Sequence, residues 1–520
     1  MVSKAFRLFT IVAVLALTLA YAPTAMAGPE SCDTRVNNTI EKLLECVTLD
    51  GAREHQAAFQ TIADANGNTR VSGSPGYDLS VEYAAQVFAD AGYNVTIQPF
   101  QFQTFVSLIP AVLEQVSPPP GGPIENNIMS YSGSGDVTAP VSVPSGDFRG
   151  CEASDFVGFP AGNIALISRG APPGFPISCT FGLKATNAYN AGASGVVIYN
   201  NIAGPLNGTL GNTFTLDIPV TGITQAMGQQ LAATPGLVLH LKTETLRGIA
   251  TTYNVLAESK DGDPNNVVMV GAHLDSVNAG PGIQDNGTGS AAILEVAEQM
   301  AKVNPRNMVR FALWGAEESN LVGSTYYVNN LSAEERAKIA LYLNFDMIGS
   351  PNHVFFIYDG DDSDAVGAGP GPAGSAQIEQ TFEAYYNMMG LPFKGTDFSG
   401  RSDYGPFIAA GIPSGGLFTG AEGIKTAEEA ATEGWGGTAG IAYDPCYHQA
   451  CDTYDNINLF AYDVNVDAVA FSTLQYAMST EDINGVNGKG NFPPLSGGGA
   501  TASTSEQSGL HDHDHDRVTE

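Results

Sequence analysis

Basic residues are scarce in this chain. Its 520 residues include 22 Lys and Arg against 54 Asp and Glu, which gives a formal net charge of −32 at pH 7. A protein this acidic repels the phosphates of nucleic acids and the head groups of anionic membranes, so we expect neither as a partner. The charge favours solubility and leaves the fold undetermined.

Long apolar runs are also missing beyond the amino terminus, where a membrane-spanning helix would need roughly 20 such residues. The first 27 residues follow a different plan, with Lys4 and Arg7, then an apolar stretch from 8 to 19, then the small residues of Ala25-Met26-Ala27. This order is typical of a secretory signal peptide. We therefore expect a soluble mature chain that is secreted, to the extracellular space or the periplasm, without a lipid anchor.

Cysteine is limited to six residues, and no Cys-x-x-Cys pair occurs, which disfavours a zinc finger. An even number of cysteines in an exported chain predicts disulfides, although sequence alone allows several connectivities. Proximity along the chain favours three pairs: Cys32–Cys46, Cys151–Cys179 and Cys446–Cys451.

Changes in amino-acid composition and hydrophobic pattern divide the chain into segments. VSPPPGGP (116–123) predicts a loop near a boundary, and the stretch after it alternates short apolar strands with helices but carries no cluster of catalytic residue types. The last residues are rich in Gly, Ser and Thr and end in GLHDHDHDRVTE, which is typical of a low-complexity tail. We predict five segments: a signal peptide (1–27), the amino-terminal part of a main domain (28–125), a small inserted α/β domain (126–246), the rest of the main domain (247–485) and the tail (486–520).

Three strands with nearly continuous apolar sequences characterise the region after 247. They are NVVMVGA (266–272), MVRFALW (308–314) and ALYLNFD (340–346), each separated from the next by a helical pattern. Such strands are buried on both faces, as in a mostly parallel sheet flanked by helices. We therefore predict a mixed α/β fold for the main domain.

Each of these strands runs into residue types that bind metals. The first is followed by His273, the second by Glu317 and Glu318, and the third ends at Asp346. Asp285 lies in the turn that follows the first strand. Sites in open α/β sheets form at the carboxyl ends of strands, so we expect these side chains to share one cleft.

Electrostatic repulsion in that cleft is the reason to expect a cation. The segments supply two basic residues, Arg310 and Arg401, against four carboxylates. Two carboxylates about 4 Å apart repel by roughly 4 kcal/mol at an effective dielectric constant near 20. A helix start offsets only about 1 kcal/mol, so either bound cations neutralise the cluster or the carboxylates are protonated.

Imidazole together with carboxylates suits zinc better than calcium or magnesium. Asp275 lies two residues from His273 and is placed to orient the imidazole ring. His448 in CYHQAC is the candidate for a second histidine ligand. Adjacent side chains diverge at a strand end, so Glu318 can bind metal while Glu317 accepts a proton from the activated water.

Taken together, five motifs resemble the co-catalytic zinc aminopeptidase family, which includes bacterial leucyl aminopeptidases and aminopeptidase Y and is related to glutamate carboxypeptidase. The motifs are HLDS (273–276), DNGTGS (285–290), AEES (316–319), NFDMIG (344–349) and DPCYHQAC (444–451). The stretch 62–100 resembles the amino-terminal part of the same family, and the insert resembles a protease-associated (PA) domain. The resemblance implies a zinc exopeptidase fold.

The resemblance also implies a role for each site residue and two zinc ions per chain. His273 and Asp346 would bind one ion, Glu318 and His448 the other, and Asp285 would bridge them. Glu317 would be the general base and acid, and Tyr447 would polarise the substrate carbonyl. FSGRSDYGPF (398–407) resembles the loop that lines the substrate pocket, which makes Arg401 and Asp403 candidates for substrate binding.

The leading hypothesis is a secreted aminopeptidase that removes apolar residues from peptides with a free amino terminus. A carboxypeptidase or a glutaminyl cyclase on the same scaffold is the alternative, although a carboxypeptidase needs basic residues gathered at the pocket. A receptor or adhesion protein of the same fold would be expected to lack ligands or the base, and here all are present. The sequence leaves the oligomeric state open.

Overall fold

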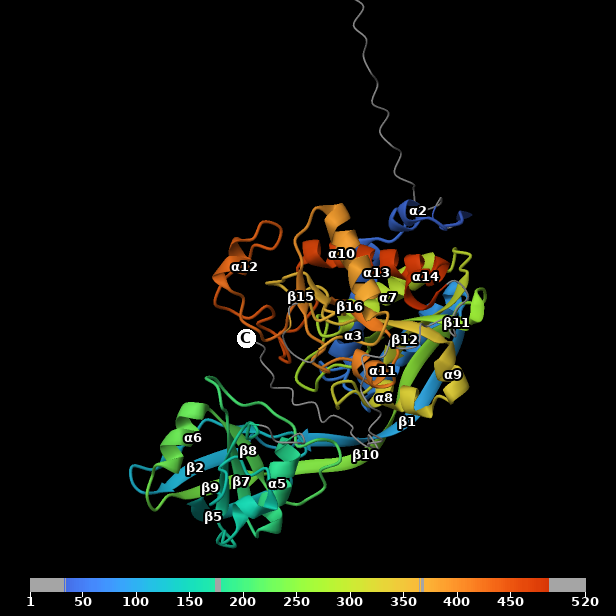
Figure 1. Ribbon diagram of the computed structural model, residues 1–520. Coiled ribbons are helices and arrows are strands. Elements are labelled where there is room, and N and C mark those ends of the chain that lie inside the picture. The colour runs from blue at the N-terminus through green and yellow to red at the C-terminus, as the bar shows by residue number, and fades with distance from the viewer. Residues whose placement is uncertain (1–31, 33, 174–178, 364, 366–368, 486–520) are drawn as a thin grey trace, which may run out of the picture.

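The computed structural model describes residues 32, 34–173, 179–363, 365 and 369–485. The predicted signal peptide (1–27) and tail (486–520) lie outside the described residues. Figure 1 shows a larger part and a smaller part, each built around its own sheet. Within the described ranges, none of the helices has the length and apolar character needed to cross a membrane.

The larger part contains an eight-stranded sheet. Four strands at its centre, β12, β11, β13 and β16, run parallel to one another, while β10 and β14 pair antiparallel to the outer two of these and β1 pairs antiparallel to β10. The strands in sheet order are β1 (Asn94–Ser107), β10 (Thr245–Glu258), β12 (Asn307–Trp314), β11 (Asp263–His273), β13 (Ile339–Phe345), β16 (Ser414–Phe418), β14 (Phe356–Tyr358) and β15 (Lys394–Thr396).

Helices cover both faces of this sheet (Figure 1). One layer consists of α3 (Leu49–Ala65), α4 (Pro75–Ala91), α7 (Gly287–Met300), α10 (Ser375–Met389) and α13 (Leu459–Met478). The other layer contains α8 (Val322–Asn330), α9 (Ala333–Lys338) and α11 (Tyr404–Ala409). The remaining helices of this part are α2 (Ile40–Leu44), α12 (Ala427–Ala431) and α14 (Glu481–Asn484).

The apolar strands predicted from the sequence are buried on both faces. In β11, Val268 and Val270 pack in the core beneath one helix layer, whereas Val267 and Met269 pack in the core beneath the other. Every residue of β13 is buried. The mixed α/β fold with helices on both faces of a largely parallel sheet is confirmed.

The smaller part contains a second eight-stranded sheet, joined to the first by the long antiparallel pair β1 and β10, which share a 14-residue register (Figure 1). Its helices are α5 (Phe181–Asn190), α6 (Gln225–Ala232) and a short 3-10 helix (Ala153–Phe156). Its strands in sheet order are β3 (Gly122–Pro123), β2 (Val112–Ser117), β9 (Val238–Thr243), β5 (Gly135–Ser142), β6 (Ile164–Ser168), β7 (Gly195–Tyr199), β8 (Val220–Ile223) and β4 (Asn127–Ile128). Strands β2 and β3, which precede residue 126, belong to this sheet.

Disulfides join the cysteines in the three pairs that proximity along the chain favours. Cys32–Cys46 lies near the amino terminus of the larger part, Cys151–Cys179 in the smaller part and Cys446–Cys451 in the loop that carries His448. All six cysteines are paired, so the described chain has no free thiol.

Candidate metal centre

Three neighbouring strands of the first sheet deliver site residues to one edge. His273 is the last residue of β11, Asp346 directly follows β13, and Glu317 and Glu318 lie in the turn after β12. Strand β11 lies between β12 and β13 and runs parallel to both. The carboxyl ends of all three strands therefore lie side by side, as the sequence predicts.

Asp285 is held against this edge by the start of α7. The next residue, Asn286, caps the helix by accepting a hydrogen bond from the Gly289 N–H. The Asn286 side-chain amide also donates to the carbonyl of Phe345, at 2.9 Å, and Phe345 is the last residue of β13. One capping residue thus ties the Asp285 turn to the strand that leads to Asp346.

His448 reaches the same edge from a separate loop, which the Cys446–Cys451 disulfide closes. Asp444 fixes the start of this loop, because its Oδ1 accepts from the Cys446 N–H at 2.8 Å. The backbone of His448 has φ of 56°, in the left-handed region that non-glycine residues seldom adopt. A constrained loop therefore aims the imidazole at the strand ends.

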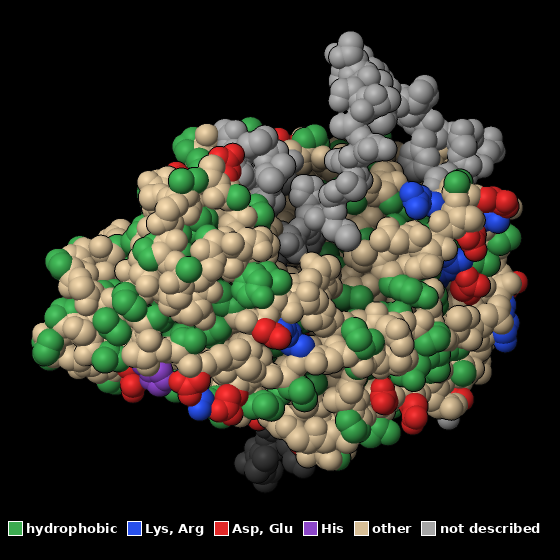
Figure 2. All heavy atoms as spheres, turned by 90° about the horizontal axis from the view of Figure 1, so that it is seen from below, with side chains coloured by type: hydrophobic (Ala, Val, Ile, Leu, Met, Phe, Trp, Pro, Cys, Tyr) green, Lys and Arg blue, Asp and Glu red, His purple; other side chains and the backbone are tan. Residues whose placement is uncertain are grey.

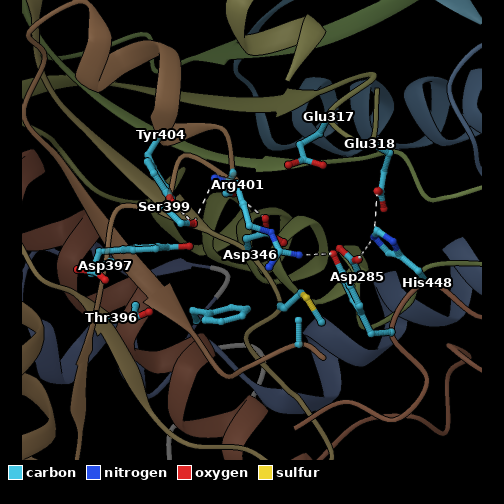
Figure 3. Close-up of a pocket in the computed structure, with 16 residues that line it drawn as sticks. Asp285, Glu317, Glu318, Asp346, Thr396, Asp397, Ser399, Arg401, Tyr404 and His448 are labelled. Atoms are coloured by element: carbon cyan, nitrogen blue, oxygen red, sulfur yellow. Dashed lines mark hydrogen bonds and ion pairs between the residues drawn. The ribbon is translucent and has the colours of Figure 1, made fainter. Parts of the chain in front are cut away.

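The donor atoms form two groups that share Asp285. Figure 3 shows Asp285, Glu318, Asp346 and His448 of these groups. In the first, His273 Nε2 lies 3.2 Å from Asp285 Oδ1 and 3.3 Å from Asp346 Oδ1. In the second, His448 Nε2 lies 3.2 Å from Asp285 Oδ2 and 3.1 Å from Glu318 Oε2. One oxygen of Asp285 faces each group, so its carboxylate lies between them.

These spacings fit zinc. A tetrahedral shell with bonds of about 2.0–2.1 Å puts neighbouring donors about 3.3 Å apart. The second carboxylate oxygen of Glu318, Oε1, is buried without a hydrogen-bond partner among the described residues, as expected for a group whose partner is an ion. Imidazole with carboxylate is also a donor set that suits zinc.

Positive charge is strongly favoured within the cluster. Burial alone would lower the pKa of His448, but Glu318 and Asp285 raise this pKa to about 10. Burial likewise opposes the charge on His273, yet Asp346 and Glu317 raise its pKa well above the ordinary value. Burial raises the pKa of Asp285, but hydrogen bonds from the two rings outweigh it and lower that pKa. The carboxylates therefore stabilise positive charge in this cluster, whether on an imidazole ring or on a bound metal ion.

Glu317 lies beside the two donor groups. Its Oε2 is 3.9 Å from His273 Nε2, a longer distance than those within the groups. Burial raises the pKa of Glu317 well above the ordinary value. Its neighbour Glu318 points toward His448 instead, so the two adjacent glutamates have different surroundings (Figure 3).

Asp275 contacts both His273 and the Glu317 segment. The His273 Nδ1 lies 3.1 Å from the backbone carbonyl of Asp275 and 3.7 Å from its carboxylate. A carbonyl can only accept, so Nδ1 donates to it and the other ring nitrogen, Nε2, faces the cluster. The Asp275 carboxylate also accepts from the Glu317 N–H at 3.2 Å, a contact that the sequence did not suggest.

Two of the remaining predicted residues line a cavity of about 110 Å³ beside the cluster. Tyr447 and Arg401 line it, whereas Asp403 is fully buried nearby, and burial raises the pKa of Asp403 to about 8. Arg310 lies elsewhere, with its Nε 2.8 Å from the Glu258 carboxylate. Among the described residues that line the cavity, Arg401 is the one arginine, and none is a lysine.

Two further charged residues were not recognised from the sequence. Arg70 is fully buried and donates to the backbone carbonyls of Leu274, Pro281 and Gly282, between His273 and Asp285. The carboxylate of Asp452 accepts from the N–H groups of Gln284, at 2.7 Å, and Asp285, at 3.0 Å. Arg70 lies in a turn-rich stretch without periodicity, so no local pattern signalled its role.

The fold and the donor set together indicate a metal-binding hydrolytic centre at the edge of a mixed α/β sheet, and known proteins agree. The model of peptidase family M28 matches residues 254–473, and the PA domain model matches residues 137–231. An aminopeptidase of Pseudomonas aeruginosa is 48% identical over 457 residues, covering 85% of this chain and 83% of the relative. The chain therefore belongs to peptidase family M28, with an inserted PA domain, and is an enzyme.

Other similar proteins have related names. A probable leucine aminopeptidase 2 of Aspergillus fumigatus is 44% identical over 442 residues, with 84% of each chain covered. Among solved structures, an aminopeptidase from Aneurinibacillus has a TM-score of 0.69 at 27% identity, covering 88% of this chain and 98% of that one. A zinc aminopeptidase from Bacillus subtilis has a TM-score of 0.59 at 25% identity, with 84% and 99% covered. The predicted family and the PA insert are confirmed.

Proposed function

We propose that this chain is a secreted di-zinc aminopeptidase that removes apolar residues from the amino terminus of peptides. The single observation that carries the proposal is the pair of donor groups sharing Asp285, with Glu317 beside them. The names of the similar proteins support an aminopeptidase over other peptidases. The three disulfides support an oxidising compartment outside the cytoplasm.

Five residues would hold the two ions. His273 and Asp346 would bind one, Glu318 and His448 the other, and Asp285 would contribute one oxygen to each. Bound zinc supplies an acidified water and polarises the peptide carbonyl. Asp275 and Arg70 would keep His273 and the Asp285 turn in place through the hydrogen bonds described above.

Glu317 would move the protons of the reaction. It takes one proton from the attacking water and later gives it to the nitrogen of the leaving amine. Its carboxylate is buried beside the two donor groups, 3.9 Å from His273 Nε2, which places it within reach of a water held there. Tyr447 would donate its hydroxyl proton in a hydrogen bond to the carbonyl oxygen as that oxygen becomes negative.

The charge of the cavity favours an amino terminus over a carboxyl terminus. The carboxylate of Glu317, which would hold no ion, lines it and attracts the positive α-amino group of a substrate. A carboxypeptidase would need a basic group to hold the terminal carboxylate. Arg401 is already paired with Glu422, at 2.7 Å, which neutralises its charge.

The cavity walls support an apolar side chain at the cleaved residue. Met347, Tyr358, Phe418 and Ala421 contribute apolar surface away from the donor groups. A volume of about 110 Å³ suits a single side chain. Because burial of apolar surface contributes about 25 cal/mol per Å², leucine-like residues should bind better than small or acidic ones.

The test measures hydrolysis of three substrates, each with and without a zinc chelator. They are leucine p-nitroanilide, a short peptide that begins with leucine, and that peptide with an acetylated amino terminus. We expect release of leucine from the free substrates, no cleavage of the acetylated peptide, and loss of activity on chelation. Readdition of zinc should restore the activity, and metal analysis should find two ions per chain. Cleavage of the acetylated peptide at its carboxyl end would contradict the aminopeptidase assignment.

A further inference from the structure

Arg401 lines the cavity beside the donor groups (Figure 3) and forms a charged pair with Glu422. Arg401 lies in the loop before α11, and its Nη1 donates to Glu422 Oε1 at 2.7 Å. Its Nη2 donates to the hydroxyl oxygen of Tyr447 at 3.2 Å. The three residues come from three separate segments, so only the folded chain brings them together.

The direction of the hydrogen bond to Tyr447 has a chemical consequence. A guanidinium group carries only donors, so the Tyr447 oxygen must accept. The hydroxyl hydrogen therefore points away from Arg401. The Tyr447 ring is held in place by stacking on His448, with ring centroids 3.8 Å apart. With the ring fixed and one lone pair occupied, the O–H bond is left to donate into the cavity.

Glu422 explains why Arg401 stays at this position. The cavity contains the carboxylates of Asp285, Glu318 and Asp346, each of which would attract a mobile guanidinium. An arginine inserted among them would occupy oxygens that the donor groups need. A charge-assisted hydrogen bond of 2.7 Å to Glu422 holds the guanidinium outside the cluster while one of its N–H groups still reaches Tyr447.

We propose that Arg401 and Glu422 are positioning residues that direct the Tyr447 hydroxyl proton toward the carbonyl oxygen of the bound substrate. The proposal rests on the proposed function, because it assigns Arg401 a role in the peptidase reaction. It replaces the role in substrate binding that the sequence suggested for Arg401. Arg401 acts through Tyr447 and does not bind a substrate carboxylate.

The experiment is a double-mutant cycle with leucine p-nitroanilide as substrate. Arg401→Met and Glu422→Gln should each lower kcat about tenfold, the effect of losing one charge-assisted hydrogen bond, with KM changed less than about twofold. Arg401→Lys should restore part of kcat, because an ammonium can still donate to the tyrosine. In a Tyr447→Phe background, Arg401→Met should have no further effect on kcat.

Zinc content and the midpoint of thermal unfolding are measured for each variant. Values equal to those of the wild type would exclude a merely structural role. Arg149→Met, which breaks a partly exposed pair with Asp147 in the smaller part, is the control and should leave kcat unchanged. If Arg401→Met does not fold, Glu422→Gln in both backgrounds gives the same cycle.

The inference is overturned if the effects of Arg401→Met and Tyr447→Phe multiply, or if KM rises while kcat is kept. A parallel loss of zinc in Arg401→Met also overturns it. If the wild-type chain does not hydrolyse the anilide, the proposed function fails. If the wild type is active and the cycle shows no coupling, the inference alone fails.

Discussion

The two sheets of this protein have similar strands but differ at the strand ends. Strand β6 in the smaller part and β13 in the larger part are both buried along their whole length. In the larger part, the residues that follow the central strands are His and carboxylates. In the smaller part, β6 and β7 are followed by Arg169 and Asn200, which bond to each other at 3.2 Å.

This difference concerns how each part neutralises its buried charged and polar groups. The smaller part satisfies its buried polar groups internally, as when the Lys184 ammonium donates to the carbonyls of Arg149 and Gly170, at 2.7 Å each. The larger part gathers like charges that remain unbalanced until cations bind. The strand and helix pattern provides an edge, and only charge at the strand ends turns that edge into a reactive centre.

The largest expected effect comes from Glu317. Glu317→Gln should lower kcat by about 10²–10⁴-fold while zinc content stays unchanged, because the variant removes the proton acceptor only. Steady-state kinetics and metal analysis test this result. Glu318→Gln, one residue along, is the matched control and should lose zinc instead. If Glu317→Gln releases zinc, the roles of the two glutamates have been assigned wrongly.

Metal removal should destabilise the larger part much more than the smaller part. Binding to the folded chain alone contributes about 4 kcal/mol per site when free zinc is a thousandfold above Kd. We therefore expect a chelator to lower the midpoint of thermal unfolding and to raise hydrogen exchange near β11 and β13. Exchange in β6 and β7 should be unaffected, and equal changes in both sheets would contradict the comparison.

A change in the smaller part should affect stability without affecting the chemistry. Lys184→Met leaves two buried carbonyls without the ammonium donor, which should lower the free energy of unfolding by about 2–5 kcal/mol. Denaturant unfolding measures this loss, and kcat/KM at 25 °C should match the wild type. Lys242→Met, on a partly exposed side chain of β9, is the control. A fall in kcat with Lys184→Met would show that the two parts are coupled.

The smallest effect concerns a buried carboxylate away from the site. Glu295 on α7 accepts from the Thr48 N–H at the start of α3, and burial raises its pKa from 4.5 to about 7. Between these pH values the folded state binds more protons than the unfolded state, so stability falls as pH rises. Glu295→Gln keeps the acceptor and should raise stability at pH 8 by about 1–3 kcal/mol.

Urea unfolding at pH 5 and pH 8 checks this expectation. At pH 5 the carboxyl group of folded wild type is mostly protonated, so the difference between wild type and Glu295→Gln should be small there. Glu334→Gln, at an exposed position on α9, should leave the pH dependence as it is. A variant that follows the wild-type pH dependence would show that Glu295 is not a source of it.

Much of the site could be predicted because its signals are local. His273, Glu317, Glu318 and Asp346 each follow an apolar strand, and the parallel arrangement brings such strand ends together. The cysteine pairs could also be predicted, since each disulfide joins one cysteine to the next cysteine along the chain. The first strands of the smaller sheet could not be predicted, because β2 and β3 flank a proline-rich loop and the loop carries no strand pattern.

The sequence by itself determined the residue types at the strand ends, and hence a cluster of carboxylates and imidazoles that needs cations. Only the tertiary structure decided which atoms face one another. Asp452 supports Asp285 from 167 residues away, and Glu422 restrains Arg401. Hydrogen bonds of this kind depend on atomic positions between distant segments, whereas periodicity and spacing along the chain report only which face or edge a residue occupies.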